Sequence, residues 1–230
     1  MSDEPVLVIT GASTGIGAAT ARRAVEFGHR VVLGARSEDK LRSLADELGG
    51  DEKALAVRCD VTSWEDQQAL VAVALERYGR LDACLANAGF GAKRGFLEES
   101  VEHWRSMIDT NVYGVALSIR ACLGHFREQG RGHMLLTSSV AGRRALPGSL
   151  YAATKWAVCA MGEGLRQEVS DSDIKVTLIE PGMVDTPFFE DSPSGALEAD
   201  DIARAVMFAI AQPAHVDVNE ILIRPIRQPT

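Results

Sequence analysis

The sequence predicts an α/β protein with a Rossmann-like, doubly wound parallel sheet in three layers. Short apolar runs alternate with helical patterns along the chain, as expected for strands that are covered by helices on both faces. A glycine-rich turn at residues 10–17 directly follows the first apolar run and precedes an alanine-rich helical pattern. The sequence contains no internal repeat, low-complexity tract or linker. We therefore expect residues 1–230 to form a single domain.

Continuous apolar runs place the strands, because parallel strands buried on both faces carry such runs. The expected strands cover residues 6–9, 30–35, 54–57, 81–86, 133–137, 175–180 and 220–223. The expected helices run from the glycine turn to about residue 27, over 38–48, up to residue 78, over 101–129, from 149 past 165, and over 200–211. Residues 187–197 contain two phenylalanines and a Ser-Pro-Ser-Gly stretch, which predict a flexible lid.

The glycine turn is the first candidate binding site. Glycines at positions 11, 15 and 17 permit a tight turn and a close approach of the backbone to a pyrophosphate. The pyrophosphate would then lie at a helix N-terminus with free N–H groups. Alternatively, Gly11, Gly15 and Gly17 serve only close packing of the helix on the strand. The position of the turn after the first strand favours binding of a dinucleotide.

The end of the second strand indicates which dinucleotide binds. An NAD-binding protein tends to place Asp or Glu here, to accept a hydrogen bond from the ribose 2′-hydroxyl. This chain has Ala35 followed by Arg36. A guanidinium pairs with a 2′-phosphate that a carboxylate would repel, so NADP(H) is favoured over NAD(H). Ser13 can add a hydroxyl contact, and the alternative is a solvated Arg36 without a ligand.

Polar side chains follow two further strands and interrupt one helix. Asp60 follows the third strand, where it can accept from an adenine amino group or cap the next helix. Asn87-Ala88-Gly89 follows the fourth strand, where the small turn lets the backbone approach a ribose while the amide fixes the strand geometry. Asn111 lies inside a helix although asparagine is a mediocre helix former. We therefore expect it to bind a water or a backbone carbonyl, or to stabilise a helix bend.

Tyr151 and Lys155 lie four residues apart in an amphipathic helical pattern, so both project from one face. A free tyrosine has a pKa of about 10, and we expect the Lys155 ammonium to lower the pKa of Tyr151 by favouring the phenolate. The phenol can then give a proton to a carbonyl oxygen or take one from an alcohol. Taken alone, such a pair is more often two bystanders on a surface helix.

A serine turn follows the fifth strand. Ser139 is placed there to hydrogen-bond a developing oxyanion, and Ser138 takes this role if the turn is shifted by one residue. The turn could also serve only its own backbone.

Composition limits the partners. The net charge of −8 at pH 7 argues against a nucleic-acid partner or an anionic membrane surface, although it allows a local basic pocket. The apolar runs are far shorter than the roughly 20 residues of a membrane span. The acidic start Met-Ser-Asp-Glu-Pro differs from a signal peptide, so we expect a cytoplasmic protein. The four cysteines lack metal-site or disulfide spacing, so we expect no metal and reduced thiols in the core.

Together the motifs resemble the short-chain dehydrogenase/reductase family, whose order they follow over most of the chain. The segments that carry this resemblance are residues 10–17, Asn87-Ala88-Gly89, Asn111, Ser139, Tyr151, Lys155 and Pro181-Gly182. The resemblance implies an NAD(P)-dependent oxidoreductase in which Tyr151 is the acid/base and Ser139 polarises the substrate oxygen. It also implies that Lys155 binds the nicotinamide ribose and tunes Tyr151, and that Asn111 holds a proton-relay water.

The same resemblance completes the set of cofactor-binding residues. It implies that Ile16 lies near the pyrophosphate and Thr186 near the carboxamide, and it adds Thr14, Val61, Pro181, Gly182 and Val184. A homo-oligomer, either a dimer or a tetramer, is implied as well, built from the long helices around Asn111 and Tyr151. The chain departs from the family at two points. Ala86 precedes Asn87 where the family usually has a second asparagine, and Ser139 stands 12 residues before Tyr151, one fewer than expected.

The resulting hypothesis is an NADP(H)-dependent oxidoreductase that transfers hydride between the nicotinamide and a secondary alcohol or carbonyl substrate. The alternative is a catalytically silent NADP-binding sensor or scaffold with the same fold, which the complete set of four polar groups disfavours. An epimerase or dehydratase is disfavoured because the chain lacks an extra substrate domain. Residues 90–97 and 187–197 are expected to select the substrate.

Overall fold

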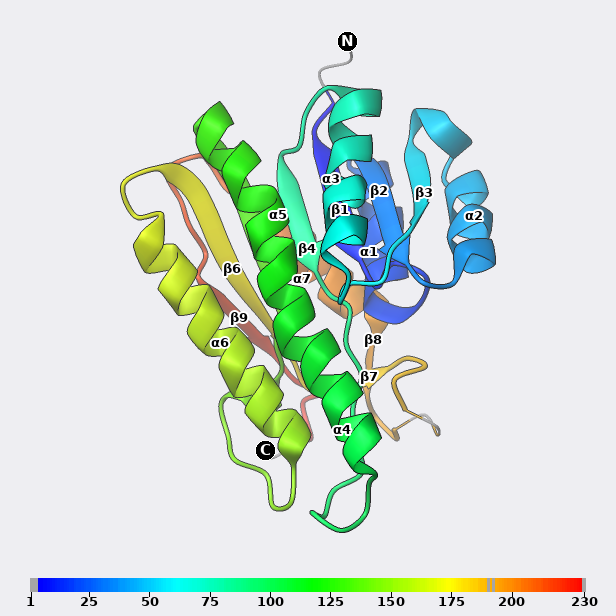
Figure 1. The fold of residues 1–230 in the computed structure, drawn as a ribbon, viewed down its shortest axis with the longest axis vertical. Helices are drawn as coiled ribbons and strands as arrows, with labels where there is room; N and C mark the ends of the chain where they lie inside the picture. The colour runs from blue at the N-terminus through cyan, green and yellow to red at the C-terminus, as the bar shows by residue number, and fades with distance from the viewer. Residues whose placement is uncertain (1–3, 190, 192, 229–230) are drawn as a thin grey trace.

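The computed structural model describes residues 4–189, 191 and 193–228, and seven parallel strands form its central sheet. The strand order is β3-β2-β1-β4-β5-β6-β9 (Figure 1). The strands are β1 (Val6–Thr10), β2 (Arg30–Ala35), β3 (Ala54–Arg58), β4 (Ala83–Ala86), β5 (Arg131–Thr137), β6 (Asp173–Pro181) and β9 (Glu220–Ile223). The direction of winding reverses between β1 and β4. In such a sheet a ligand crevice opens outside the carboxyl ends of these two strands.

Helices cover both faces of the sheet, which confirms the predicted three layers. In front of the sheet in Figure 1 lie α3 (Trp64–Tyr78), α5 (Gly114–Gln129) and α6 (Leu150–Glu168). Behind it lie α1 (Gly15–Glu26) and α7 (Ala199–Ile210), and α2 (Glu38–Glu47) packs against β2 and β3. The shorter helical elements are η1 (Gly50–Glu52), α4 (Val101–Ile108), the π-helical turn η2 (Asp109–Tyr113) and η3 (Val140–Gly142).

Each face of the sheet has its own hydrophobic core. Along β1, Val6 and Val8 belong to the core beneath α3, α5 and α6. Leu7 and Ile9 belong to the core beneath α1, α2 and α7. Successive side chains of a strand point to opposite faces, so a strand covered on both sides needs the continuous apolar run that the sequence contains.

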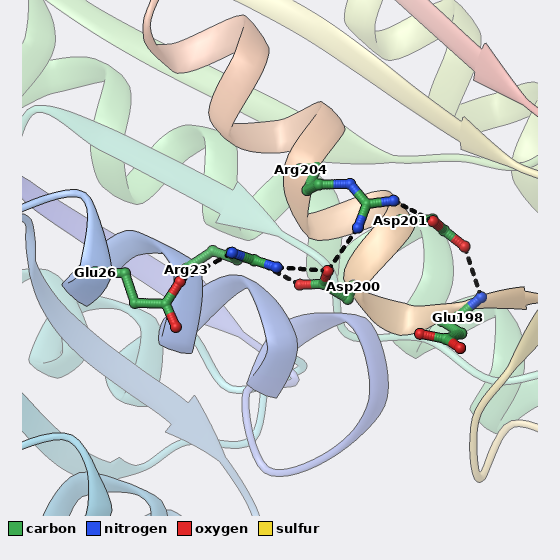
Figure 2. Close-up of polar contacts among 6 residues, drawn as sticks. All are labelled: Arg23, Glu26, Glu198, Asp200, Asp201 and Arg204. Carbon is green, nitrogen blue, oxygen red and sulfur yellow. Dashed lines mark hydrogen bonds and ion pairs between the residues drawn. The ribbon is translucent and has the colours of Figure 1, made fainter.

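Charged residues join the two helices behind the sheet (Figure 2). The Arg23 guanidinium of α1 donates to both carboxylate oxygens of Asp200 at the start of α7, over 2.6 and 2.7 Å. Arg204 donates to the same carboxylate over 2.7 Å. The Glu198 backbone N–H donates to the Asp201 carboxylate over 2.8 Å and completes a capping box. These contacts fix the beginning of α7 beside the helix that follows the glycine turn.

A small two-stranded sheet brackets the predicted lid. β7 (Val184–Asp185) pairs with β8 (Leu197–Glu198), so the ends of the intervening segment lie side by side. Two positions of this segment, Glu190 and Ser192, lie outside the described residues, as does the acidic start at residues 1–3. The flexibility of the lid stays a prediction.

Every strand and helix expected from the sequence is present, with small shifts at the ends. β5 and β6 each begin two residues earlier than expected, and the long helix at 101–129 contains the π-helical turn η2. β7, β8, η1 and η3 were not predicted, because elements of two or three residues are too short to show a hydrophobic period. Among the described residues, no helix combines the length and apolar character needed to cross a membrane.

Candidate active site

A cleft of about 610 Å³ opens at the carboxyl ends of the strands and brings most of the predicted site residues together. The predicted residues that line it are Gly11, Ser13, Thr14, Gly15, Ile16, Arg36, Asp60, Val61, Asn87, Ala88, Gly89, Ser139, Tyr151, Lys155, Pro181, Gly182, Val184 and Thr186. Gly17 and Asn111 are buried and lie outside this lining. The cleft therefore joins the dinucleotide motif to the Tyr151 helix.

The glycine turn packs tightly against the segment after β4. Gly11 has a φ of +65°, and a Cβ there would lie 2.8 Å from the Ala88 Cα atom. A Cβ on Gly17 would lie 2.4 Å from the Gly11 carbonyl oxygen. Gly17 therefore allows helix α1 to pack on the turn, and its contact with a cofactor stays a prediction. Gly11 and Gly15 remain at the cleft surface.

The first turn of α1 is suited to an anion. Its N-cap residue, Thr14, makes no side-chain cap hydrogen bond among the described residues. By contrast, serine side chains cap α3, α4 and α6 at Ser63, Ser100 and Ser149. Uncapped N–H groups at a helix N-terminus attract negative charge. The turn at the cleft thus fits a pyrophosphate.

The other end of the cleft holds Arg36, Ser37 and Asp60. Arg36 is exposed, and Ser37 makes no cap hydrogen bond to α2 among the described residues, so both side chains can meet a ligand. Asp60 accepts hydrogen bonds from the Thr62 backbone N–H over 3.0 Å and from its hydroxyl over 2.8 Å. The Thr62 N–H is the largest cause that lowers the pKa of Asp60, and Arg36 contributes. Asp60 thus orders its own turn while lining the cleft.

Asn87 ties three neighbouring strands together. Its amide nitrogen donates to the Thr10 carbonyl over 3.2 Å at the end of β1, and its amide oxygen accepts from the Thr137 hydroxyl over 3.3 Å at the end of β5. The Thr10 hydroxyl oxygen also accepts from the backbone N–H groups of Asn87 and Ala88, over 3.0 and 3.2 Å. The predicted role of the amide in fixing strand geometry is supported by these contacts.

Asn111 lies in the π-helical turn η2 and is fully buried. Its side-chain oxygen accepts from the Phe90 backbone N–H over 3.1 Å, and its nitrogen donates to the Phe90 carbonyl over 2.9 Å. Its nitrogen also donates to the Thr154 hydroxyl over 3.2 Å. The side chain therefore binds a backbone carbonyl, one of the expected alternatives. It holds the segment after β4 rather than facing the cleft.

Ser139 and Tyr151 both line the cleft, and the Ser139 side chain lowers the pKa of Tyr151 in part. Burial has the larger effect and raises this pKa to about 12. Ser138 points elsewhere, because its hydroxyl donates to the Lys155 carbonyl over 3.0 Å and contacts the Cys159 sulfur at 3.1 Å. Of the two serines, Ser139 is the one beside the phenol.

Lys155 is 4% exposed, and its Nζ atom donates to the Thr137 carbonyl over 2.8 Å. Burial lowers its pKa to about 8. The Nζ atom lies 5.7 Å from the centroid of the Tyr151 ring. The prediction that this amine lowers the pKa of Tyr151 is wrong for the arrangement seen here, because the loss of hydration around the phenol outweighs every other influence on it.

A family model described as short chain dehydrogenase matches residues 5–196. The chain belongs to the short-chain dehydrogenase family. An uncharacterized oxidoreductase of Staphylococcus haemolyticus is 42% identical over 225 residues, which are 96% of this chain and 97% of that protein. These likenesses confirm the resemblance read from the motifs and show that the protein is an oxidoreductase.

Two solved structures of dehydrogenases share the fold over nearly the whole chain. An alcohol dehydrogenase from the archaeon Thermococcus sibiricus, complexed with 5-hydroxy-NADP, has a TM-score of 0.90 and 34% identity, covering 99% of both chains. A short-chain dehydrogenase/reductase from Burkholderia phymatum, in complex with NAD, has a TM-score of 0.86 and 29% identity. That match covers 96% of this chain and 89% of the other.

The short-chain dehydrogenase cleft also contains residues that the motifs did not reveal. The Phe188 ring lies 5.5 Å from the Tyr151 ring and 5.1 Å from the Phe189 ring, between centroids. Arg94 and Arg144 line the cleft as well. Phe188, Phe189 and the arginine of the 90–97 loop are visible in the sequence. Their convergence on the cleft that holds Tyr151 depends on loop geometry.

A buried carboxylate behind the serine turn was missed as well. Glu180 is 1% exposed and pairs with the Arg143 Nε atom over 2.6 Å. Its only sequence signal was an acidic residue at the end of an apolar strand. Among the described residues, no group of three or more His, Cys, Asp or Glu side chains is arranged to hold a metal ion.

Proposed function

We propose that this protein is an NADP(H)-dependent oxidoreductase that transfers hydride between the nicotinamide and a secondary alcohol or carbonyl substrate. One observation carries the proposal: Tyr151, Ser139 and Lys155 line the same cleft as the uncapped N-terminus of α1. A proton-exchanging group and a pyrophosphate site are thus held in one crevice. When bound, the nicotinamide accepts or supplies the hydride.

The chain's own residues divide the remaining work. We assign Tyr151 as the acid/base and Ser139 as the group that orients and polarises the substrate oxygen. Lys155 would bind the nicotinamide ribose. Asn111 would act by holding Phe90 and the end of β4, and a relay water at this position stays a prediction.

In the reductive direction Tyr151 acts as the acid. Burial raises its pKa to about 12, so at neutral pH the phenol is protonated, as an ordinary tyrosine is, and can donate to a carbonyl oxygen. Reduction then balances as follows: the carbonyl carbon gains hydride, the oxygen gains the Tyr151 proton, and solvent reprotonates the phenolate. Oxidation of the alcohol reverses these transfers and becomes easier as pH rises.

The preference for NADP(H) is part of the proposal and rests on the second strand. Ala35 leaves the end of β2 without a carboxylate, and Arg36 and Ser37 place a guanidinium and a hydroxyl there. These groups suit a 2′-phosphate.

A cytoplasmic location and a homo-oligomer, either a dimer or a tetramer, remain proposals of the same kind. Exposed apolar side chains on the helices around Asn111 and Tyr151 support an interface between copies, namely Val101, Ile108, Tyr113 and Trp156. Light scattering on the purified protein would measure the number of copies.

A substrate panel tests the proposed function against its alternative. We expect NADPH oxidation with some members of a panel of small aldehydes, ketones and oxo acids, and NADP⁺ reduction with the matching alcohols. Tight NADPH binding without turnover across the whole panel would instead favour a catalytically silent sensor or scaffold. Calorimetric measurement of NADPH binding in parallel separates that outcome from a misfolded preparation.

A further inference from the structure

The turn at residues 138–143 carries Ser139 and packs between β6 and α6. Gly142 shows how tightly it is held, because a Cβ there would lie 2.6 Å from the Ser138 hydroxyl, 2.8 Å from the Cys159 sulfur and 2.8 Å from the Lys155 carbonyl oxygen. On this side the turn therefore rests directly on the helix that carries Tyr151. A displacement of the turn would change the distance between the two side chains.

On its other side the turn is held by three consecutive residues of β6. The Ser138 backbone N–H donates to the Ile179 carbonyl over 2.7 Å. The Arg143 guanidinium donates to the Glu180 carboxylate over 2.6 Å. The Ser139 hydroxyl donates to the Pro181 carbonyl over 3.3 Å. The ion pair thus anchors the far end of the turn, and backbone contacts anchor its beginning.

The Glu180 carboxylate has a costly position for a purely structural group. Burial raises the pKa of Glu180. Two neighbours lower it in part, namely the Cys159 thiol, which donates to the carboxylate over 3.2 Å, and the Arg143 guanidinium. Arg143 also contacts the Glu220 carboxylate on β9, so it spans the outer two strands. A buried ion pair rarely stabilises a fold more than packed apolar residues would, but it specifies one geometry.

We propose that Arg143 and Glu180 are positioning residues, whose ion pair holds the 138–143 turn so that the Ser139 hydroxyl reaches the Tyr151 hydroxyl. The position of the 138–143 turn does not depend on which reaction the protein catalyses. The effect of the ion pair on turnover rests on the proposed function, in which Ser139 and Tyr151 act on the substrate oxygen.

The surroundings of Tyr151 make this contact measurable. Among the described residues, the Ser139 side chain is the influence that lowers the pKa of Tyr151, while burial raises it. Lys155 on the same helix has its Nζ atom 5.7 Å from the ring centroid, Arg94 and Arg144 line the same cleft, and the neighbouring Phe188 ring carries no charge. Loss of the Ser139 contact should therefore raise the pKa of Tyr151.

Nuclear magnetic resonance can follow the contact without any turnover. The chain has three tyrosines, so labelling their Cζ atoms with carbon-13 gives three signals, of which Tyr151 is the one missing from Tyr151→Phe. We expect Arg143→Gln and Glu180→Gln to move the Tyr151 signal in the same direction as Ser139→Ala does. Arg143→Lys, which keeps the charge, should restore part of the wild-type position.

A control removes an exposed ion pair that also involves α6. Arg127 pairs with Glu168 over 2.8 Å on the exposed surface of α5 and α6, so Arg127→Gln should leave the Tyr151 signal unchanged. If Arg143→Gln fails to fold, Glu180→Gln, which keeps the size of the side chain, carries the test. A Tyr151 signal that stays at its wild-type position in the folded variants, while Ser139→Ala moves it, would overturn the proposal.

Kinetics on an identified substrate give the second readout. We expect Arg143→Gln to lower kcat about 10- to 100-fold while the Kd for NADPH changes less than about threefold, because misplacement of a catalytic group reduces turnover more than cofactor affinity. The inflection of kcat against pH for alcohol oxidation should also move to higher pH. An unmoved inflection with a normal Tyr151 signal contradicts the positioning role. A shifted signal in a protein that turns over no member of the panel would instead favour the catalytically silent alternative and leave the positioning role standing.

Discussion

At the scale of single residues, burial shifts the pKa values of Tyr151 and Lys155 in the cleft. Tyr151 is held as a neutral phenol and the pKa of the Lys155 ammonium is lowered to about 8, both because the cleft removes water from around them. Sequence spacing placed these two residues on one helical face, but spacing does not reveal how much solvent remains. The sign of the effect on Tyr151 therefore had to come from the folded structure.

Arg36 supports a prediction at this scale. Replacing Arg36 with Ala should weaken NADPH binding about 10- to 100-fold and NADH binding much less, because a charge-assisted contact to the 2′-phosphate contributes about 1.5–3 kcal/mol. Calorimetric titration with both cofactors measures the two losses. Arg42→Ala, which removes an exposed arginine of α2 that pairs with Glu38, is the control and should change neither affinity. Equal losses for NADPH and NADH would show that Arg36 does not contact the 2′ position.

At the scale of elements, the join between β1 and α1 shapes the cofactor end of the cleft. The backbone turns so sharply there that Gly11 has a positive φ and Gly17 leaves no room for a side chain. The strands, the helices and the glycine turn could be predicted from the sequence because hydrophobic period and glycine spacing are local signals. The functions of individual glycines could not, because they depend on which atoms a Cβ would meet.

Two glycine substitutions test this reading of the turn. Gly17→Ala should destabilise the protein by about 1–3 kcal/mol and weaken NADPH binding, because its Cβ would lie 2.4 Å from a backbone oxygen that cannot move freely. Gly124→Ala lies inside α5, where a Cβ would meet no described atom within 4 Å, and should stabilise the protein by about 0.5–1 kcal/mol. Urea unfolding measures both. A Gly17→Ala variant as stable as Gly124→Ala would contradict the packing role.

At the scale of the whole molecule, loops from distant parts of the sequence converge on the end of the sheet. The Gly95 N–H donates to the Gly148 carbonyl over 2.8 Å and joins the loop after β4 to the loop before α6. Phe188 packs on Tyr151 from the segment after β7. Sequence reasoning found the residue types but not this convergence, because long-range contacts fix the loops and leave no local period. The substrate end was accordingly the least predictable part of the site.

Global stability should depend on pH through a histidine in the sheet. His133 of β5 is 4% exposed, contacts the Thr177 hydroxyl at 2.8 Å, and has its pKa lowered by burial to about 3. Below about pH 6.5 the unfolded chain protonates this ring while the native state does not. The unfolded state then binds more protons, so the free energy of unfolding should fall as pH decreases from 6.5 towards 3.

The uncharged His133→Gln variant isolates this contribution. Between pH 6 and pH 4 the wild type should lose more stability than the variant, by about 1.4 kcal/mol for each pH unit. Urea unfolding at several pH values measures the difference. Parallel stability curves for the two proteins would show that His133 does not titrate in this way.

The most direct measurement is the turnover of Tyr151→Phe, compared with the wild type on any substrate found in the panel. The variant keeps the aromatic ring and its contact with Phe188 but lacks the exchangeable proton. We predict a loss of kcat of about 100-fold or more, with an unchanged Kd for NADPH. A variant that retains most of its activity would contradict the assignment of this phenol as the proton donor.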